Sequence, residues 1–138
     1  MTAPKFARIV SAALAALAVA LLPVSIAEAH HSYAATFDVD HHITLKGKMT
    51  QFGFRNPHSY IQLEVPDGKG SSVRWSVEWS GTSSLTSAGI DRGTLKVGDV
   101  LKVVVSPSRV KGELRAQFVS FVRERDGLSW GLKGEKVD

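Results

Sequence analysis

Apolar and polar residues alternate along most of the chain after residue 42, which is the period of half-buried β-strands. The alternation predicts strands over residues 43–54, 60–65, 73–79 and 114–123. In the first strand the apolar phase slips by one residue between Met49 and Phe52, as it does at a β-bulge. Residues 100–105 are apolar on both faces, so we expect them to form a central strand.

The alternation stops between the third and fourth predicted strands. Residues 81–90 fit a short helix, with Thr82 or Ser83 as its N-cap and Gly89 just past its end. Five strands, a bulged first strand and a helix after the third follow the order of an OB-fold. We therefore predict an all-β protein with an OB-fold-like Greek-key barrel. The alternative is a β-sandwich, which needs about seven strands.

The first 29 residues have a different pattern, typical of a secretory signal peptide. Lys5 and Arg8 precede an apolar run over residues 9–22, and Ala27-Glu28-Ala29 supplies small residues for a cleavage site. We predict cleavage after Ala29 and localisation in the periplasm or outside the cell. Cleavage after Ala27 remains open, as does an uncleaved segment, which would be the protein's only contact with a membrane.

This division predicts three parts: a signal peptide over 1–29, a histidine-rich arm over 30–42 and a barrel over 43–138. The arm carries four of the five histidines. We expect it to have little regular structure and to pack against the barrel through Tyr33 and Phe37.

The composition limits the kinds of site and partner that the protein can have. The chain has no cysteine, which excludes a disulfide, a thiolate nucleophile and a cysteine-ligated metal. Its formal net charge of +4 is spread along the chain instead of forming a patch, so we expect no nucleic-acid partner. No pair of carboxylates and no nucleophile elbow stands out, and we predict a protein that is not an enzyme.

Histidines are the strongest candidates for metal ligands. Cleavage after Ala29 would make His30 the first residue, and its amine and ring could chelate one ion. A third nitrogen from another imidazole completes an arrangement that suits Cu(II) better than Zn(II). We predict metal ligands at His30, His31 and His58, with His41 and His42 as possible additional ligands.

Four polar residues near His58 complete the predicted site. Asn56 can hydrogen-bond within its own turn, and Pro57 stiffens the segment. Glu78 could orient the His58 ring, or it could instead pair with Arg74. Tyr60 and Gln62 lie on the outward face of the second predicted strand, where a ligand could bind.

The mature chain resembles a family of small secreted bacterial proteins that is known only as a domain of unknown function. The resemblance lies in the start His30-His31-Ser32-Tyr33-Ala34 and in the element Asn56-Pro57-His58. It also includes Leu45-Lys46-Gly47, Trp75 with Glu78, and the turn Gly98-Asp99. It implies export and a small β fold, and it implies no activity.

Two functions of different classes follow. The first is an exported, non-enzymatic metal-binding protein that holds or delivers copper, with a periplasmic metal donor or acceptor as its partner. The second is a periplasmic OB-type interaction module that binds a protein, glycan or small ligand without metal.

Overall fold

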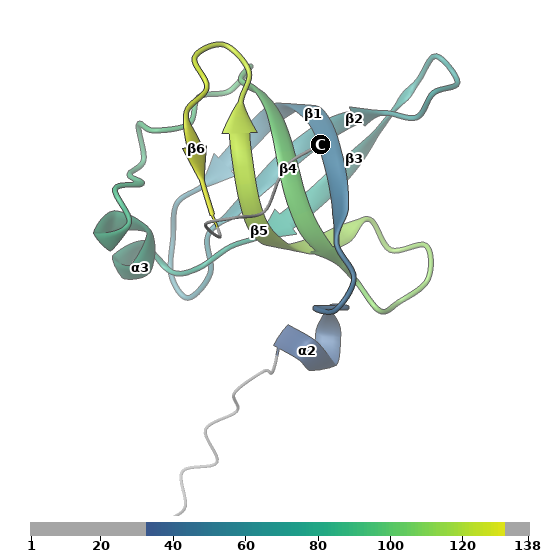
Figure 1. The fold of residues 1–138 in the computed structure, drawn as a ribbon, viewed down its shortest axis with the longest axis horizontal. Helices are drawn as coiled ribbons and strands as arrows, with labels where there is room; N and C mark the ends of the chain where they lie inside the picture. Colours follow the sequence, from purple (N-terminus) through teal and green to yellow (C-terminus); the bar gives the residue numbers. More distant parts are fainter. Residues whose placement is uncertain (1–32, 132–138) are drawn as a thin grey trace, which may run out of the picture. The chain divides into compact units, whose positions relative to one another are not determined.

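The computed structural model describes residues 33–131, which form one curled sheet with two short helices (Figure 1). The order of the strands in the sheet is β3-β2-β1-β4-β5-β6. A parallel pairing between β3 and β5 closes the barrel. The elements are α2 (Tyr33–Thr36), β1 (Ile43–Gly53), β2 (Tyr60–Pro66), β3 (Ser72–Glu78), α3 (Thr82–Ser87), β4 (Val100–Pro107), β5 (Arg115–Arg123) and β6 (Ser129–Trp130).

The predicted all-β, OB-like barrel is confirmed, with α3 between β3 and β4. A single sheet closes on itself, so the sandwich alternative does not apply. No helix within residues 33–131 has the length and apolar character needed to cross a membrane.

The bulge in β1 explains how one strand serves both sides of the barrel. The first half of β1 pairs with β4, and the second half pairs with β2. The register shifts between Met49 and Gln51, where the sequence predicts the slip. Gly47 is required before this bend, because a Cβ there would lie 2.6 Å from the Glu64 carbonyl oxygen.

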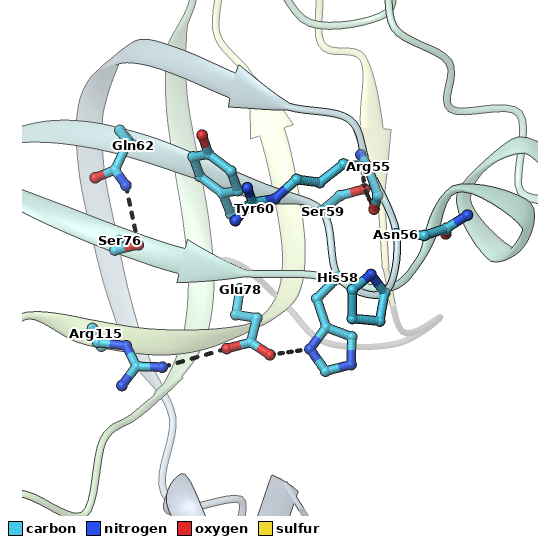
Figure 2. A pocket seen from close by; sticks show the side chains of 10 residues that line it. Arg55, Asn56, His58, Ser59, Tyr60, Gln62, Ser76, Glu78 and Arg115 are labelled. Atoms are coloured by element: carbon cyan, nitrogen blue, oxygen red, sulfur yellow. Dashed lines mark hydrogen bonds and ion pairs between the residues drawn. The ribbon is translucent and has the colours of Figure 1, made fainter. Parts of the chain in front are cut away.

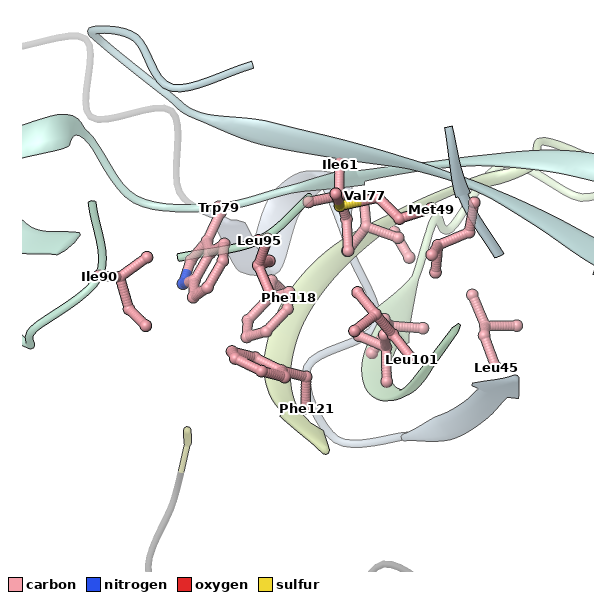
Figure 3. Close-up of a cluster of buried hydrophobic side chains, with 14 of the residues drawn as sticks. Leu45, Met49, Ile61, Val77, Trp79, Ile90, Leu95, Leu101, Phe118 and Phe121 are labelled. Carbon is pink, nitrogen blue, oxygen red and sulfur yellow. The ribbon is translucent and has the colours of Figure 1, made fainter. Parts of the chain in front are cut away.

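The barrel interior is filled by side chains from every strand of the closed barrel (Figure 3). Trp79 is 3% exposed and stacks on Phe118 with ring centroids 3.9 Å apart. Phe121 meets the same tryptophan edge-on at 6.0 Å. From outside the strands, α3 adds Leu85, and the loop after it adds Ile90 and Leu95.

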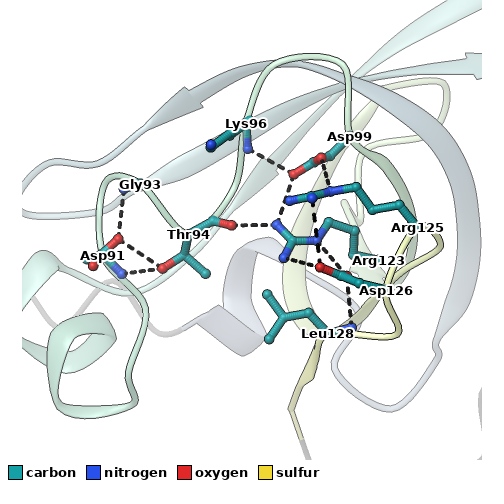
Figure 4. A network of polar contacts seen from close by, with 9 residues as sticks. All are labelled: Asp91, Gly93, Thr94, Lys96, Asp99, Arg123, Arg125, Asp126 and Leu128. Atoms are coloured by element: carbon teal, nitrogen blue, oxygen red, sulfur yellow. Dashed lines mark hydrogen bonds and ion pairs between the residues drawn. The ribbon is translucent and has the colours of Figure 1, made fainter.

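A polar network ties the loop before β4 to the end of β5 (Figure 4). The Asp99 carboxylate accepts hydrogen bonds from the Lys96 backbone N–H at 2.9 Å and from Arg123 Nη1 at 3.1 Å. Arg123 also donates to Asp126 Oδ2 at 2.8 Å. Burial alone would raise the pKa of Asp99, but these donors hold that pKa below its usual range.

Three details differ from the sequence prediction. Residues 33–36 form a helix, where an arm with little regular structure was expected. The tail forms a short sixth strand, β6, along the edge of β5. The N-cap of α3 is Gly81, not Thr82 or Ser83, and glycine has no side chain that could cap the helix.

Candidate functional site

The loop between β1 and β2 positions His58 beside a groove. It contains the cis peptide bond Asn56-Pro57. Ser59 is fully buried, and its hydroxyl donates to the Arg55 carbonyl at 3.1 Å and accepts from the Arg55 N–H at 3.2 Å. Ser59 therefore fixes the backbone at both ends of the short segment that carries His58.

Asn56 anchors this loop to α3. Its Oδ1 accepts hydrogen bonds from the Thr82 N–H at 2.9 Å and from the Thr82 hydroxyl at 3.0 Å. The expected bond within its own turn is therefore replaced by one to a residue 26 positions later. Because Gly81 has no side chain to cap the helix, Asn56 supplies the missing acceptor.

His58 and Glu78 face each other across the end of the β2–β3 pair (Figure 2). Glu78 Oε1 contacts Nδ1 of His58, and Glu78 Oε2 lies 3.5 Å from Arg115 Nη2. Of the two partners considered for Glu78, the structure therefore shows His58. Arg74 lies 3.7 Å from Glu64 instead. Since Nδ1 of His58 is engaged, Nε2 is the ring nitrogen left for another partner.

The segment around α2 packs against the same corner. Phe37 is 2% exposed and forms a β-bridge with Ser108, so this part of the expected packing is confirmed. The Tyr33 ring lies 5.5 Å from the His58 ring, centroid to centroid. Burial, with a smaller contribution from the charge of Glu78, raises the pKa of the Tyr33 hydroxyl. A cavity of about 320 Å³ lies between this segment, His58 and Arg115.

A larger groove of about 630 Å³ extends from His58 along the outer face of β2 and β3. Tyr60 and Gln62 line it, as the sequence predicts, because the strand pairing sets them opposite Glu78 and Ser76. Gln62 Nε2 donates to the Ser76 hydroxyl at 3.1 Å. The groove is therefore walled by polar side chains from β2, β3, the start of β5 and the β1–β2 loop.

The predicted metal ligands fall into three groups. His30 and His31 lie outside the described residues. His41 and His42 are exposed and line neither cavity beside His58. Within residues 33–131, no cluster of three or more histidines, aspartates and glutamates could hold a metal ion. The structure thus brings His58 together with Glu78 and Tyr33, but not with His41 or His42.

Three residues of this site were missed by the sequence analysis. Arg115 reaches Glu78 because β5 pairs in parallel with β3, and no local pattern predicts that closure. Tyr33 was expected only to pack, and Arg55 lies just past the strand predicted over residues 43–54. Arg55 holds its guanidinium 4.8 Å from the centre of the Tyr60 ring.

Comparison with known proteins gives one match. The profile of a family of unknown function, DUF6152, matches residues 16–115. No curated protein and no solved structure matches the chain.

Proposed function

The chain belongs to DUF6152, a family of unknown function. From the site around His58, we propose that it is an exported copper-binding protein. Cleavage after Ala29 releases the chain into the periplasm with His30 at its start. The His30 amine and ring bind Cu(II) together with Nε2 of His58, and His31 completes or tunes the site. The protein holds the ion or passes it to a periplasmic partner.

One observation carries this proposal: Glu78 engages Nδ1 of His58. A carboxylate behind one ring nitrogen fixes the orientation of the imidazole and makes the other nitrogen a better metal ligand. The side chain of His58 is 41% exposed, so it is open to solvent. In its neutral form, an imidazole that donates from Nδ1 has an unprotonated Nε2.

His30 is close in sequence to a residue that packs on His58. Only two residues separate His30 from Tyr33 in the sequence. The Tyr33 ring packs on the His58 ring. This connection supports a shared ion, and three nitrogen donors favour copper over zinc.

The test is electron paramagnetic resonance of exported protein with one equivalent of Cu(II). Intact mass first establishes that the chain begins at His30. His30→Ala and His58→Ala should each change the copper hyperfine pattern and weaken binding, whereas His41→Ala, an exposed histidine outside both cavities, should leave the spectrum unchanged. A spectrum that neither His30→Ala nor His58→Ala alters would refute the proposal, and so would an effect of His41→Ala as large as theirs.

Copper binding should also weaken in acid. The amine and the imidazoles must lose protons before they can bind the ion, so protons compete with copper. A titration from pH 8 to pH 5 that leaves the affinity constant would contradict nitrogen ligation.

A further inference from the structure

The polar groove beside His58 carries an inference that goes beyond copper. We propose that it binds an acidic sugar, a short oligosaccharide with a carboxylate on its ring, whose carboxylate is held by Arg55. The groove volume of about 630 Å³ lies within the range of small-ligand sites.

Contacts within the protein fix the position of Arg55 before any ligand binds. Its backbone N–H and carbonyl are both bonded to the buried Ser59 hydroxyl. Its guanidinium lies over the Tyr60 ring, and Gln51 Nε2 holds the Tyr60 hydroxyl at 2.7 Å. A guanidinium fixed against an aromatic face loses little freedom when it binds a carboxylate, which it can contact through two parallel hydrogen bonds.

The acidic side chains around the groove are paired with other residues and not with Arg55. On the opposite wall, Glu78 is shared between His58 and Arg115, and Glu113 lies 3.2 Å from Arg115. Among residues 33–131, Arg55 has no acidic side chain within ion-pair distance. A ligand with one negative charge near Arg55 therefore complements the groove better than a neutral or a cationic one.

The rest of the lining suits hydroxyl groups. Gln62 and Ser76 provide neutral donors and acceptors along the floor, and Asn56 lies at the loop end (Figure 2). Neutral hydrogen-bonding side chains beside the Arg55 guanidinium match a molecule with many hydroxyls and a ring carboxylate. The location is also the face on which OB-folds bind oligosaccharides and oligonucleotides, formed by β2, β3 and the loops before β2 and β5. That likeness is one of fold alone.

The experiment is a calorimetric titration of the exported protein with digalacturonate, in a buffer that contains a metal chelator. Binding should be measurable and should weaken as salt rises, because an ion pair at an open groove is screened. Neutral digalactose should bind at least about tenfold more weakly, since it lacks the carboxylate that Arg55 recognises. A dinucleotide in the same titration distinguishes a phosphate ligand from a sugar acid.

Two arginine variants provide the matched comparison. Arg55→Gln should weaken digalacturonate binding about tenfold or more, because it removes the charge while the backbone bonds to Ser59 remain. Arg74→Gln removes an exposed arginine of β3 that lies outside the groove, and binding should not change. Absence of binding, equal affinity for the neutral sugar, tighter binding of the dinucleotide, or an equal loss in both variants would each overturn the proposal.

The result is separable from the copper experiment. The titration contains a chelator, so failure of copper binding leaves its outcome intact.

Discussion

Replacing Asp99 with alanine should remove about 3 kcal/mol from the free energy of unfolding. The side chains of Asp99 and Arg123 are each only 7% exposed, and their atoms lie 3.1 Å apart. Deleting one partner of a buried ion pair costs about 3–5 kcal/mol, because the other charge stays buried without compensation.

The structure favours the lower end of that range. In the variant Arg123 keeps its bond to Asp126 Oδ2 at 2.8 Å and its bond to the Thr94 carbonyl at 2.6 Å. At about 4–8 °C per kcal/mol for a domain near 100 residues, the midpoint of thermal unfolding should fall by about 12–24 °C. Domains of this kind have about 5–15 kcal/mol in total, so the variant should still fold.

Urea unfolding of the exported protein measures this loss, with Arg125→Ala as the control. Arg125 donates to the other oxygen of Asp99 at 3.0 Å, but its side chain is 55% exposed. Ion pairs of exposed groups contribute about 1 kcal/mol or less, so the control should change stability little. A loss below about 1 kcal/mol in Asp99→Ala, or an equal loss in both variants, would show that burial does not determine the strength of this network.

Three further predictions concern the loop, the metal and acid. Asn56→Ala should lower the free energy of unfolding, measured in urea, by about 1 kcal/mol, because the N-terminus of α3 loses its hydrogen-bond acceptor. Asn56→Asp should retain most of this stability, and equal losses in the two variants would contradict capping. Glu78→Gln should lower copper affinity about 10- to 100-fold in a competition titration, since His58 loses its carboxylate; unchanged affinity would mean that Glu78 does not support the metal ligand. The hydrogen bond from Arg123 lowers the pKa of Asp126 to about 2. Its contribution to stability is therefore complete above about pH 4 and should be lost as pH falls towards 2. Urea unfolding from pH 5 to pH 2 should show a shallower decline for Asp126→Asn, and an identical decline would refute this assignment.

Much of the barrel was predictable because strand periodicity is a local property. Alternation marks a strand wherever one face is buried, and the slip after Met49 marks the bulge without knowledge of any partner. The short helix was also predictable, although its cap was not. Gly81 precedes α3, and the acceptor comes from Asn56 in a different loop.

The candidate site was only half predictable. The outward positions of Tyr60 and Gln62 follow from the period of β2, and the choice of Glu78 as a partner for His58 was one of two alternatives. Export, the copper ligands and the role of His30 stay predictions, since residues 1–32 lie outside the described part of the chain.

The sequence by itself determined which segments become strands, where the first one bends and which faces are apolar, because each of these depends on neighbours within a few residues. The tertiary structure decided which side chains meet. Arg115 reaches Glu78 only through the parallel closure of β5 on β3, and Tyr33 reaches His58 only because Phe37 is buried against the barrel. Such contacts depend on strand register and loop closure between segments far apart in the chain, and no local pattern encodes them.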